Sequence, residues 1–235
     1  MDSFKRLILI LGMLICIGVL FAEQTDNLLQ TLRQKAEKNI SILPAYCKKD
    51  YQSLLKKYPD RLMSFLLAYE ENGRLAVVDS KIIENHYLSV TELMKERNIT
   101  TPDEFFLSYI AKLTVSDEVI CDYRQYFEQE EIDGKPGLNL KKLRKEAKSD
   151  EELYRIAMLK TNEYLRYKPT SGRDQSPLDV VKKSLYGRCE EWQIMFVAVC
   201  RTLGLPARPA STPWWAHQDD NHAWSEININ GAWHY

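Results

Sequence analysis

The segment from Cys189 to Leu203, CEEWQIMFVAVCRTL, constrains the fold of this 235-residue chain more than any other. Its apolar residues recur at positions 192, 195, 196, 199, 200 and 203, which is the spacing of the buried face of a helix. Gly204 follows directly, and glycine is the residue most favoured just after the end of a helix. We therefore predict a central core helix that begins at Cys189 and ends at Gly204.

A β-hairpin is predicted at the end of the sequence. Asn230-Gly231 is the two-residue signal for a type I′ turn, here between strands at residues 222–229 and 232–235. This turn places Ile229 opposite Ala232, and the position opposite His222 then falls beyond the last residue given. The segment LPARPAS, residues 205–211, is compatible with one more short strand. A core helix beside antiparallel strands predicts an α+β class for this part of the chain.

The preceding part of the chain, residues 23–167, is predicted to be a helical N-terminal region. Apolar residues such as those at positions 83, 87, 90 and 94 repeat at the helical period. Thr101 and Ser149 each precede a glutamate by three residues, which predicts helix starts at both. His86 lies on an apolar helix face and is interpreted as a packed core histidine. A polar connection at residues 168–179 then leads into a second region, residues 168–235.

The first 22 residues have the pattern of a signal peptide. Lys5 and Arg6 precede the apolar run 7–21, and Ala22 supplies a small residue for cleavage. The run is shorter than the roughly 20 residues of a spanning helix, so a permanent anchor is the less favoured interpretation, and a lipid anchor on Cys16 is less favoured still. We expect export to a periplasmic or extracellular location. Membrane contact is expected only through an uncleaved signal segment.

The charge balance bears on the possible partners. The formal net charge is -1, and Lys and Arg form no basic cluster, so we expect no nucleic-acid partner. Removal of the signal segment leaves Cys47, Cys121, Cys189 and Cys200, and an oxidising compartment permits a disulfide among them. Cys189 and Cys200 lie about 16 Å apart along one helix and cannot bridge. If any pair forms, Cys47 with Cys121 is favoured.

Cys189 has the position of a reactive thiol. Unpaired backbone N–H groups and the helix dipole favour the thiolate at a helix start, whereas the negative charges of Glu190 and Glu191 offset part of this effect. His222 begins a predicted strand, a rigid position from which an imidazole can meet the thiol. Trp214 and Trp215 precede it and are interpreted as a wall for a substrate, with packing onto the core as the alternative.

Three segments carry a resemblance to a known family: GRCEEWQIMFVAVCRTLGLPARPAS, NHAW and NGAWHY. Together they resemble the transglutaminase-like fold of papain-type thiol enzymes, over about residues 185–235. The resemblance implies that Cys189 is the nucleophile and His222 its base, with an oxyanion held by backbone N–H groups that include that of the cysteine. It also implies a third Asp or Glu a few residues after Tyr235, and hence a truncated domain of an exported bacterial type. We expect neither a cofactor nor a metal.

The sequence therefore predicts an exported thiol enzyme that hydrolyses an amide in a peptide or peptide-like substrate, such as cell-wall material or a glycoprotein. Two alternatives stay open: an amine-accepting, cross-linking transglutaminase, and a non-catalytic binding module. A metal site from His217, Asp219, Asp220 and His222 is the least favoured interpretation, since the spacing matches no standard zinc pattern. With the strand opposite His222 incomplete, weak turnover is expected unless Asp219 or Asp220 orients the imidazole.

Overall fold

The computed structural model describes residues 27–132, 134–169, 172–216 and 221–235. The predicted signal peptide lies outside this part of the chain. The polypeptide forms two compact units, which meet in the sequence at Tyr69 and Glu70. Each unit has its own helices and its own buried residues.

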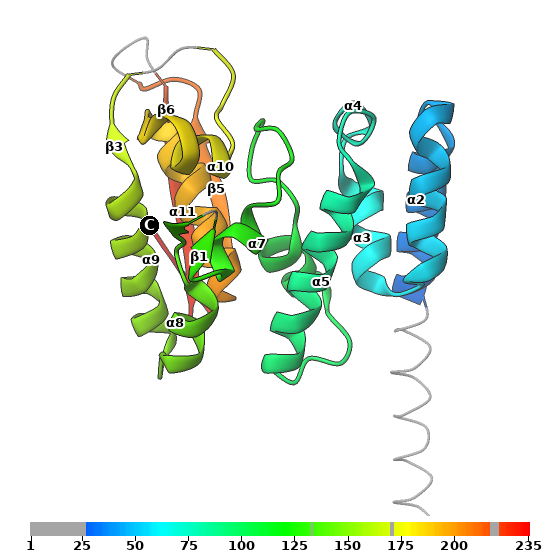
Figure 1. The fold of residues 1–235 in the computed structure, drawn as a ribbon, viewed down its shortest axis with the longest axis horizontal. Helices are drawn as coiled ribbons and strands as arrows, with labels where there is room; N and C mark the ends of the chain where they lie inside the picture. The colour runs from blue at the N-terminus through cyan, green and yellow to red at the C-terminus, as the bar shows by residue number, and fades with distance from the viewer. Residues whose placement is uncertain (1–26, 133, 170–171, 217–220) are drawn as a thin grey trace, which may run out of the picture. The chain divides into compact units, whose positions relative to one another are not determined.

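The first unit is a small helical assembly. Residues 27–41 form a helix, followed by α2 (Ala45–Lys57) and α3 (Arg61–Tyr69) (Figure 1). Each of these segments contributes buried apolar side chains, including Leu32, Tyr51 and Met63. The helical character predicted for this part of the chain is confirmed.

The second unit begins with a series of helices. Their bounds are α4 (Asn72–Leu75), α5 (Ser80–Glu96), α6 (Glu104–Phe106), the π-helical turn η1 (Leu107–Ala111), α7 (Tyr123–Glu128), α8 (Leu140–Glu146) and α9 (Asp150–Tyr164). The periodic apolar positions predicted at 83, 87, 90 and 94 are all buried in α5. His86 is 1% exposed and its Nε2 lies 2.8 Å from the Ala111 carbonyl oxygen, which confirms the packed core histidine.

The two predicted helix starts have different outcomes. Ser149 is the N-cap of α9 and accepts a hydrogen bond from the Glu152 backbone N–H, as expected. The prediction for Thr101 is wrong, because Asp103 caps α6 by accepting from the Phe106 backbone N–H at 2.8 Å. Aspartate is a stronger N-cap than threonine, and its carboxylate is in reach of the N–H groups of the first turn.

Short elements connect α7 to the central helix. The strands β1 (Glu131–Ile132) and β2 (Lys135–Pro136) pair antiparallel, and β3 (Arg166–Tyr167) pairs in parallel with β4 (Tyr186–Gly187). Between β3 and β4 lie α10 (Pro177–Asp179) and the π-helical turn η2 (Val180–Ser184). The β3–β4 pair holds the end of α9 next to the start of the central helix, which begins at Cys189.

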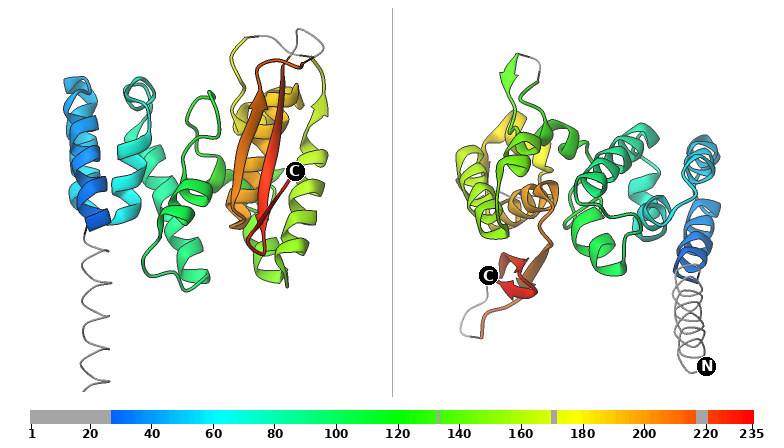
Figure 2. Two further views of the ribbon diagram at one scale, coloured as in Figure 1. Left: turned by 180° about the vertical axis from the view of Figure 1, so that it is seen from behind. Right: turned by 90° about the horizontal axis from the view of Figure 1, so that it is seen from below.

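The central helix is α11 (Cys189–Leu203), with the bounds predicted from the sequence and Gly204 in the left-handed conformation at its end. It packs on one side against the three-stranded sheet and on the other against α7, α8 and α9 (Figure 2). Gln193 ties the helix to the sheet, because its Nε2 donates to the carbonyl oxygens of Ala210 and Trp224. This arrangement confirms the α+β class.

The sheet has the order β5 (Ala207–Thr212), β6 (His222–Ile229), β7 (Ala232–His234), and all its pairs are antiparallel. The predicted register is confirmed, since Ile229 lies opposite Ala232. Asn230 and Gly231 both have positive φ, 52° and 86°, as a type I′ turn requires. On its other side, β6 pairs with β5 along its length up to His222, which faces Thr212 and is thereby fixed in the sheet.

Three further predictions concern the whole chain. The domain boundary predicted between residues 167 and 168 stays a sequence prediction. Helices α7, α8 and α9, which precede this boundary in the sequence, pack against α11 within the second unit. Cys47, Cys121, Cys189 and Cys200 are free thiols in the structure, and the favoured Cys47–Cys121 pair, which would join residues of the two units, stays a prediction. Within the described ranges, no helix has both the length and the apolar character needed to cross a membrane.

Candidate active site

The start of α11 is held by a buried carboxylate. Arg188 is the N-cap residue, and its backbone N–H donates to Glu191 at 2.8 Å. Glu191 is only 1% exposed and also accepts from the Gln175 backbone N–H at 3.2 Å. The carboxylate therefore satisfies one backbone donor at the helix start and one in the connection before it, which stabilises the start of α11.

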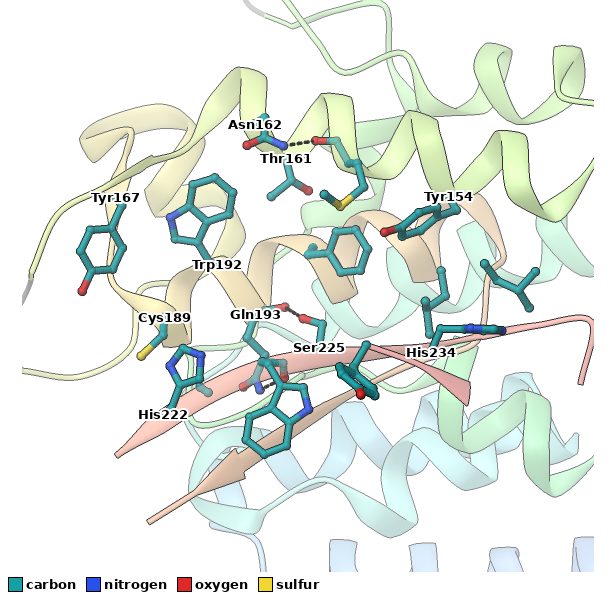
Figure 3. A pocket seen from close by; sticks show the side chains of 17 residues that line it. Tyr154, Thr161, Asn162, Tyr167, Cys189, Trp192, Gln193, His222, Ser225 and His234 are labelled. Atoms are coloured by element: carbon teal, nitrogen blue, oxygen red, sulfur yellow. Dashed lines mark hydrogen bonds between the residues drawn. The ribbon is translucent and has the colours of Figure 1, made fainter. Parts of the chain in front are cut away.

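Cys189 and His222 lie beside each other at one end of the same cavity (Figure 3). Cys189 is the first residue of α11, and His222 is the first residue of β6. The Ala223 backbone N–H faces the thiol, which places the sulfur against the beginning of the strand. Each side chain is thus attached to the end of a rigid element, and the packing of α11 on β6 brings the two ends together.

The protonation of the thiol is governed by more than the helix start. The Cys189 Sγ donates to Glu190 Oε2 at 3.1 Å, and the same oxygen accepts from Arg188 Nε at 2.9 Å. Burial is the largest cause that raises the pKa of Cys189, and the hydrogen bond to Glu190 is the second. The backbone N–H of Ala223 lowers the pKa, but the net change is upward. The expectation that the helix start favours the thiolate is therefore outweighed. The largest cause is burial, which the sequence does not show.

The two predicted tryptophans occupy different surroundings. Trp215 stacks on the His222 imidazole, with ring centroids 5.8 Å apart and planes at 28°. Trp214 is 68% exposed and lines neither of the cavities that contain the thiol. Trp224 also stacks on the imidazole, at 6.2 Å and 25°, and sequence reasoning missed it. Its signal was present, because residues two apart on a strand share a face.

The larger cavity beside the thiol has a volume of about 650 Å³ and mostly apolar walls. Side chains from α9, α11 and β6 form these walls: Tyr154, Met158, Trp192, Phe196, Ile227 and Ile229. Trp192 and Phe196 are the two residues of the predicted core face that are only half-buried. The helical period alone assigned them to the core, and the position of α9 decides that they border a cavity instead.

A second cavity, of about 530 Å³, also borders Cys189 and His222 and is more polar. Arg188, Glu190, Trp215 and Asn221 contribute to its lining, together with Cys189, His222 and Tyr167. Arg188 also forms an ion pair with Asp174 at 3.0 Å. The thiol and the imidazole therefore line both an apolar cavity and a polar one.

The alternative metal site falls almost entirely outside the described residues and stays untested. His217, Asp219 and Asp220 lie outside the described residues, and the remaining ranges contain no group of three or more His, Cys, Asp or Glu side chains suited to a metal. The possible role of Asp219 or Asp220 in orienting the imidazole likewise concerns residues outside the described part.

A central helix that begins with a cysteine packs on an antiparallel sheet, in keeping with a cysteine-protease-like fold. Residues 140–235 match the family model of the transglutaminase-like superfamily, so this part of the chain is a transglutaminase-like domain. The match begins at α8 and so includes helices before the segment in which the sequence resemblance was found. Comparisons with curated proteins and with solved structures gave no match.

Proposed function

We propose that this protein is an exported, thiol-dependent acyl-transfer enzyme that hydrolyses an amide bond in a peptide or peptide-like substrate. The observation that carries the proposal is the placement of Cys189 and His222, which begin α11 and β6 and line the same two cavities. Members of the transglutaminase-like superfamily are usually thiol enzymes, which supports the same conclusion. The proposal assigns the nucleophile to Cys189 and the base to His222.

The proposed reaction has two stages. The imidazole of His222 takes the thiol proton, and the Cys189 sulfur attacks the carbonyl carbon of the amide. Negative charge on the carbonyl oxygen is stabilised by backbone N–H groups at the start of α11, including that of Cys189. The C–N bond then breaks as the imidazolium protonates the leaving amine, and water, deprotonated by the imidazole, releases the acid from the thioester.

A non-catalytic binding module is the second candidate. The observation in its favour is the hydrogen bond from the Cys189 thiol to Glu190, together with a raised pKa for that thiol. A protonated thiol held by a carboxylate is a poor nucleophile. In that case the two cavities would bind a ligand without turnover.

Alkylation by iodoacetamide across a pH series, combined with an amide-hydrolysis assay, distinguishes the two candidates. The enzyme proposal expects Cys189 to be modified selectively and turnover to be lost in Cys189→Ala and His222→Ala. Cys121 is an internal reference, because burial raises its pKa to about 11 and it should react slowly. An inert Cys189 with no turnover would favour the binding module. Incorporation of an added amine in place of water would indicate a cross-linking enzyme.

The export part of the proposal is tested separately. Intact-mass analysis of the secreted protein should give a chain that begins near Glu23. Exported protein that still carries Met1 would contradict cleavage of a signal peptide.

A further inference from the structure

The apolar cavity begins at the thiol and extends along α11. Trp192 and Phe196 lie three and seven residues after Cys189, and both line the cavity. At 1.5 Å per residue, Phe196 is about 10 Å further along the helix axis than the nucleophile. The cavity therefore has room beyond the thiol for a group of the length of a large side chain.

The opposite wall of this cavity comes from β6 and α9. Ile227 and Ile229 line it from β6, and Tyr154 and Met158 line it from α9. No Lys, Arg, Asp or Glu side chain is in the described lining, and its only titratable nitrogen groups are the imidazoles of His222 and His234. A charged group there loses hydration for few charged partners, whereas an apolar group gains free energy from its burial. The cavity thus selects for apolar ligand groups.

The polar cavity has the opposite character. Arg188, Glu190 and Asn221 line it, and His222 is accessible from it. The amine released by acyl transfer leaves as a polar or charged product, and the water that cleaves the thioester must reach the imidazole. Departure of the amine and entry of water are therefore both favoured through the polar cavity. The acyl group stays bonded to sulfur during both steps, so the apolar cavity is the one available to hold it.

We propose that the apolar cavity receives the acyl part of the substrate, and that this part carries a bulky apolar or aromatic group close to the carbonyl attacked by Cys189. The inference rests on the function proposed above and adds its substrate class. A short acyl chain, or one that ends in a carboxylate, is expected to react more slowly than a bulky apolar one. The volume of about 650 Å³ is within the range of ligand-binding cavities and exceeds what a methyl group can fill.

The test uses three 4-nitrophenyl ester probes with the same leaving group: 3-phenylpropanoyl, acetyl and 3-carboxypropanoyl. Acylation of Cys189 is followed on the full chain by release of nitrophenol and by intact mass, with Cys189→Ala as the blank. Each acylation rate is divided by the rate of the same probe with a small free thiol. Because the cavity buries a large apolar group, this relative rate should be roughly 10-fold to 100-fold higher for the 3-phenylpropanoyl probe than for either of the others.

Two neighbouring residues on α9 provide a matched pair of variants. Met158 is 41% exposed and lines the cavity, whereas Leu159 is 70% exposed and does not. Met158→Glu places a carboxylate in the cavity wall and should lower the ratio of 3-phenylpropanoyl to acetyl acylation about tenfold. Leu159→Glu introduces the same charge one residue away and should leave the ratio as it is.

Equal acylation by all three probes, with Cys189 still modified, would overturn the acyl-group assignment and leave the thiol chemistry standing. An unchanged ratio in Met158→Glu would also overturn the assignment. If no probe acylates Cys189, the proposed function fails, and the cavity is then judged by binding of 3-phenylpropionamide to Cys189→Ala in NMR titrations. Binding tighter than that of acetamide, and weakened by Met158→Glu, would support the apolar site; equal binding would refute it.

Discussion

Replacement of Glu190 by Gln should make the Cys189 thiol more reactive near neutral pH. The Glu190 carboxylate lies 3.1 Å from the sulfur and raises the thiol pKa, second only to burial among the causes. Two unit charges about 4 Å apart repel by about 1 kcal/mol in water and about 4 kcal/mol at an effective dielectric constant of 20. Glu190 is partly exposed, and Arg188 lies 2.9 Å from the same oxygen, so the lower value applies.

A gain of about 1 kcal/mol for the thiolate corresponds to about fivefold faster alkylation below the pH at which the thiol titrates. The glutamine keeps the side-chain length and can donate a hydrogen bond to the sulfur. Iodoacetamide rates at several pH values, with peptide mapping of Cys189, measure the effect. Added salt should reduce the difference between the two proteins, because it screens partly exposed charges.

Glu163→Gln is the matched control, since it removes an exposed carboxylate that pairs with Lys160 on α9 and lines neither of the two cavities at Cys189. Its alkylation rate at Cys189 should equal that of the unmodified protein. If Glu190→Gln reacted at the same rate as this control, or more slowly, the reasoning from the Glu190 contact would be refuted. The hydrogen bond would then have no influence on the ionisation of the thiol.

Three further predictions concern stability. Arg144→Met should destabilise the protein by about 3 to 5 kcal/mol in urea titrations, because it removes the guanidinium that lies 2.7 Å from Glu96 and 3.0 Å from Glu128. Among the described residues, Glu96 then keeps only the contact with Lys145 at 3.5 Å, and Glu128 only the Ser89 hydroxyl; a loss below 1 kcal/mol would contradict the reasoning. Burial, followed by nearby arginine charge, holds the pKa of His86 well below its usual range, so the folded state keeps the ring neutral. Stability should fall below about pH 6.5, at most by about 1.4 kcal/mol per pH unit, and His86→Gln should flatten that dependence in thermal melts; parallel curves would refute it. Thr161→Val should leave the melting temperature unchanged or raise it, because the buried Thr161 hydroxyl has no hydrogen-bond partner among the described residues. A clear decrease in the melting temperature would show that the hydroxyl does have a partner.

The sequence alone determined the elements that depend on local periodicity and turn chemistry. The bounds of α11 followed from its apolar spacing and Gly204, and the register of β6 with β7 followed from Asn230-Gly231. These predictions succeeded because helix ends and two-residue turns depend on neighbouring residues, whose backbone preferences act at short range. The positions of Cys189 and His222 at the starts of their elements could be stated for the same reason.

Only the tertiary structure decided what surrounds the thiol. Burial raises the pKa of Cys189, and whether a helix start is buried depends on segments distant in the sequence. Trp192 and Phe196 have the spacing of core residues, yet the placement of α9 and β6 around them leaves a cavity at their side. Trp215 stacks on the imidazole of His222, seven residues further along the chain, and no local spacing specifies that contact. Helical and strand periods specify which face of an element is apolar, whereas the packing of distant elements decides whether that face is filled by protein or left open for a ligand.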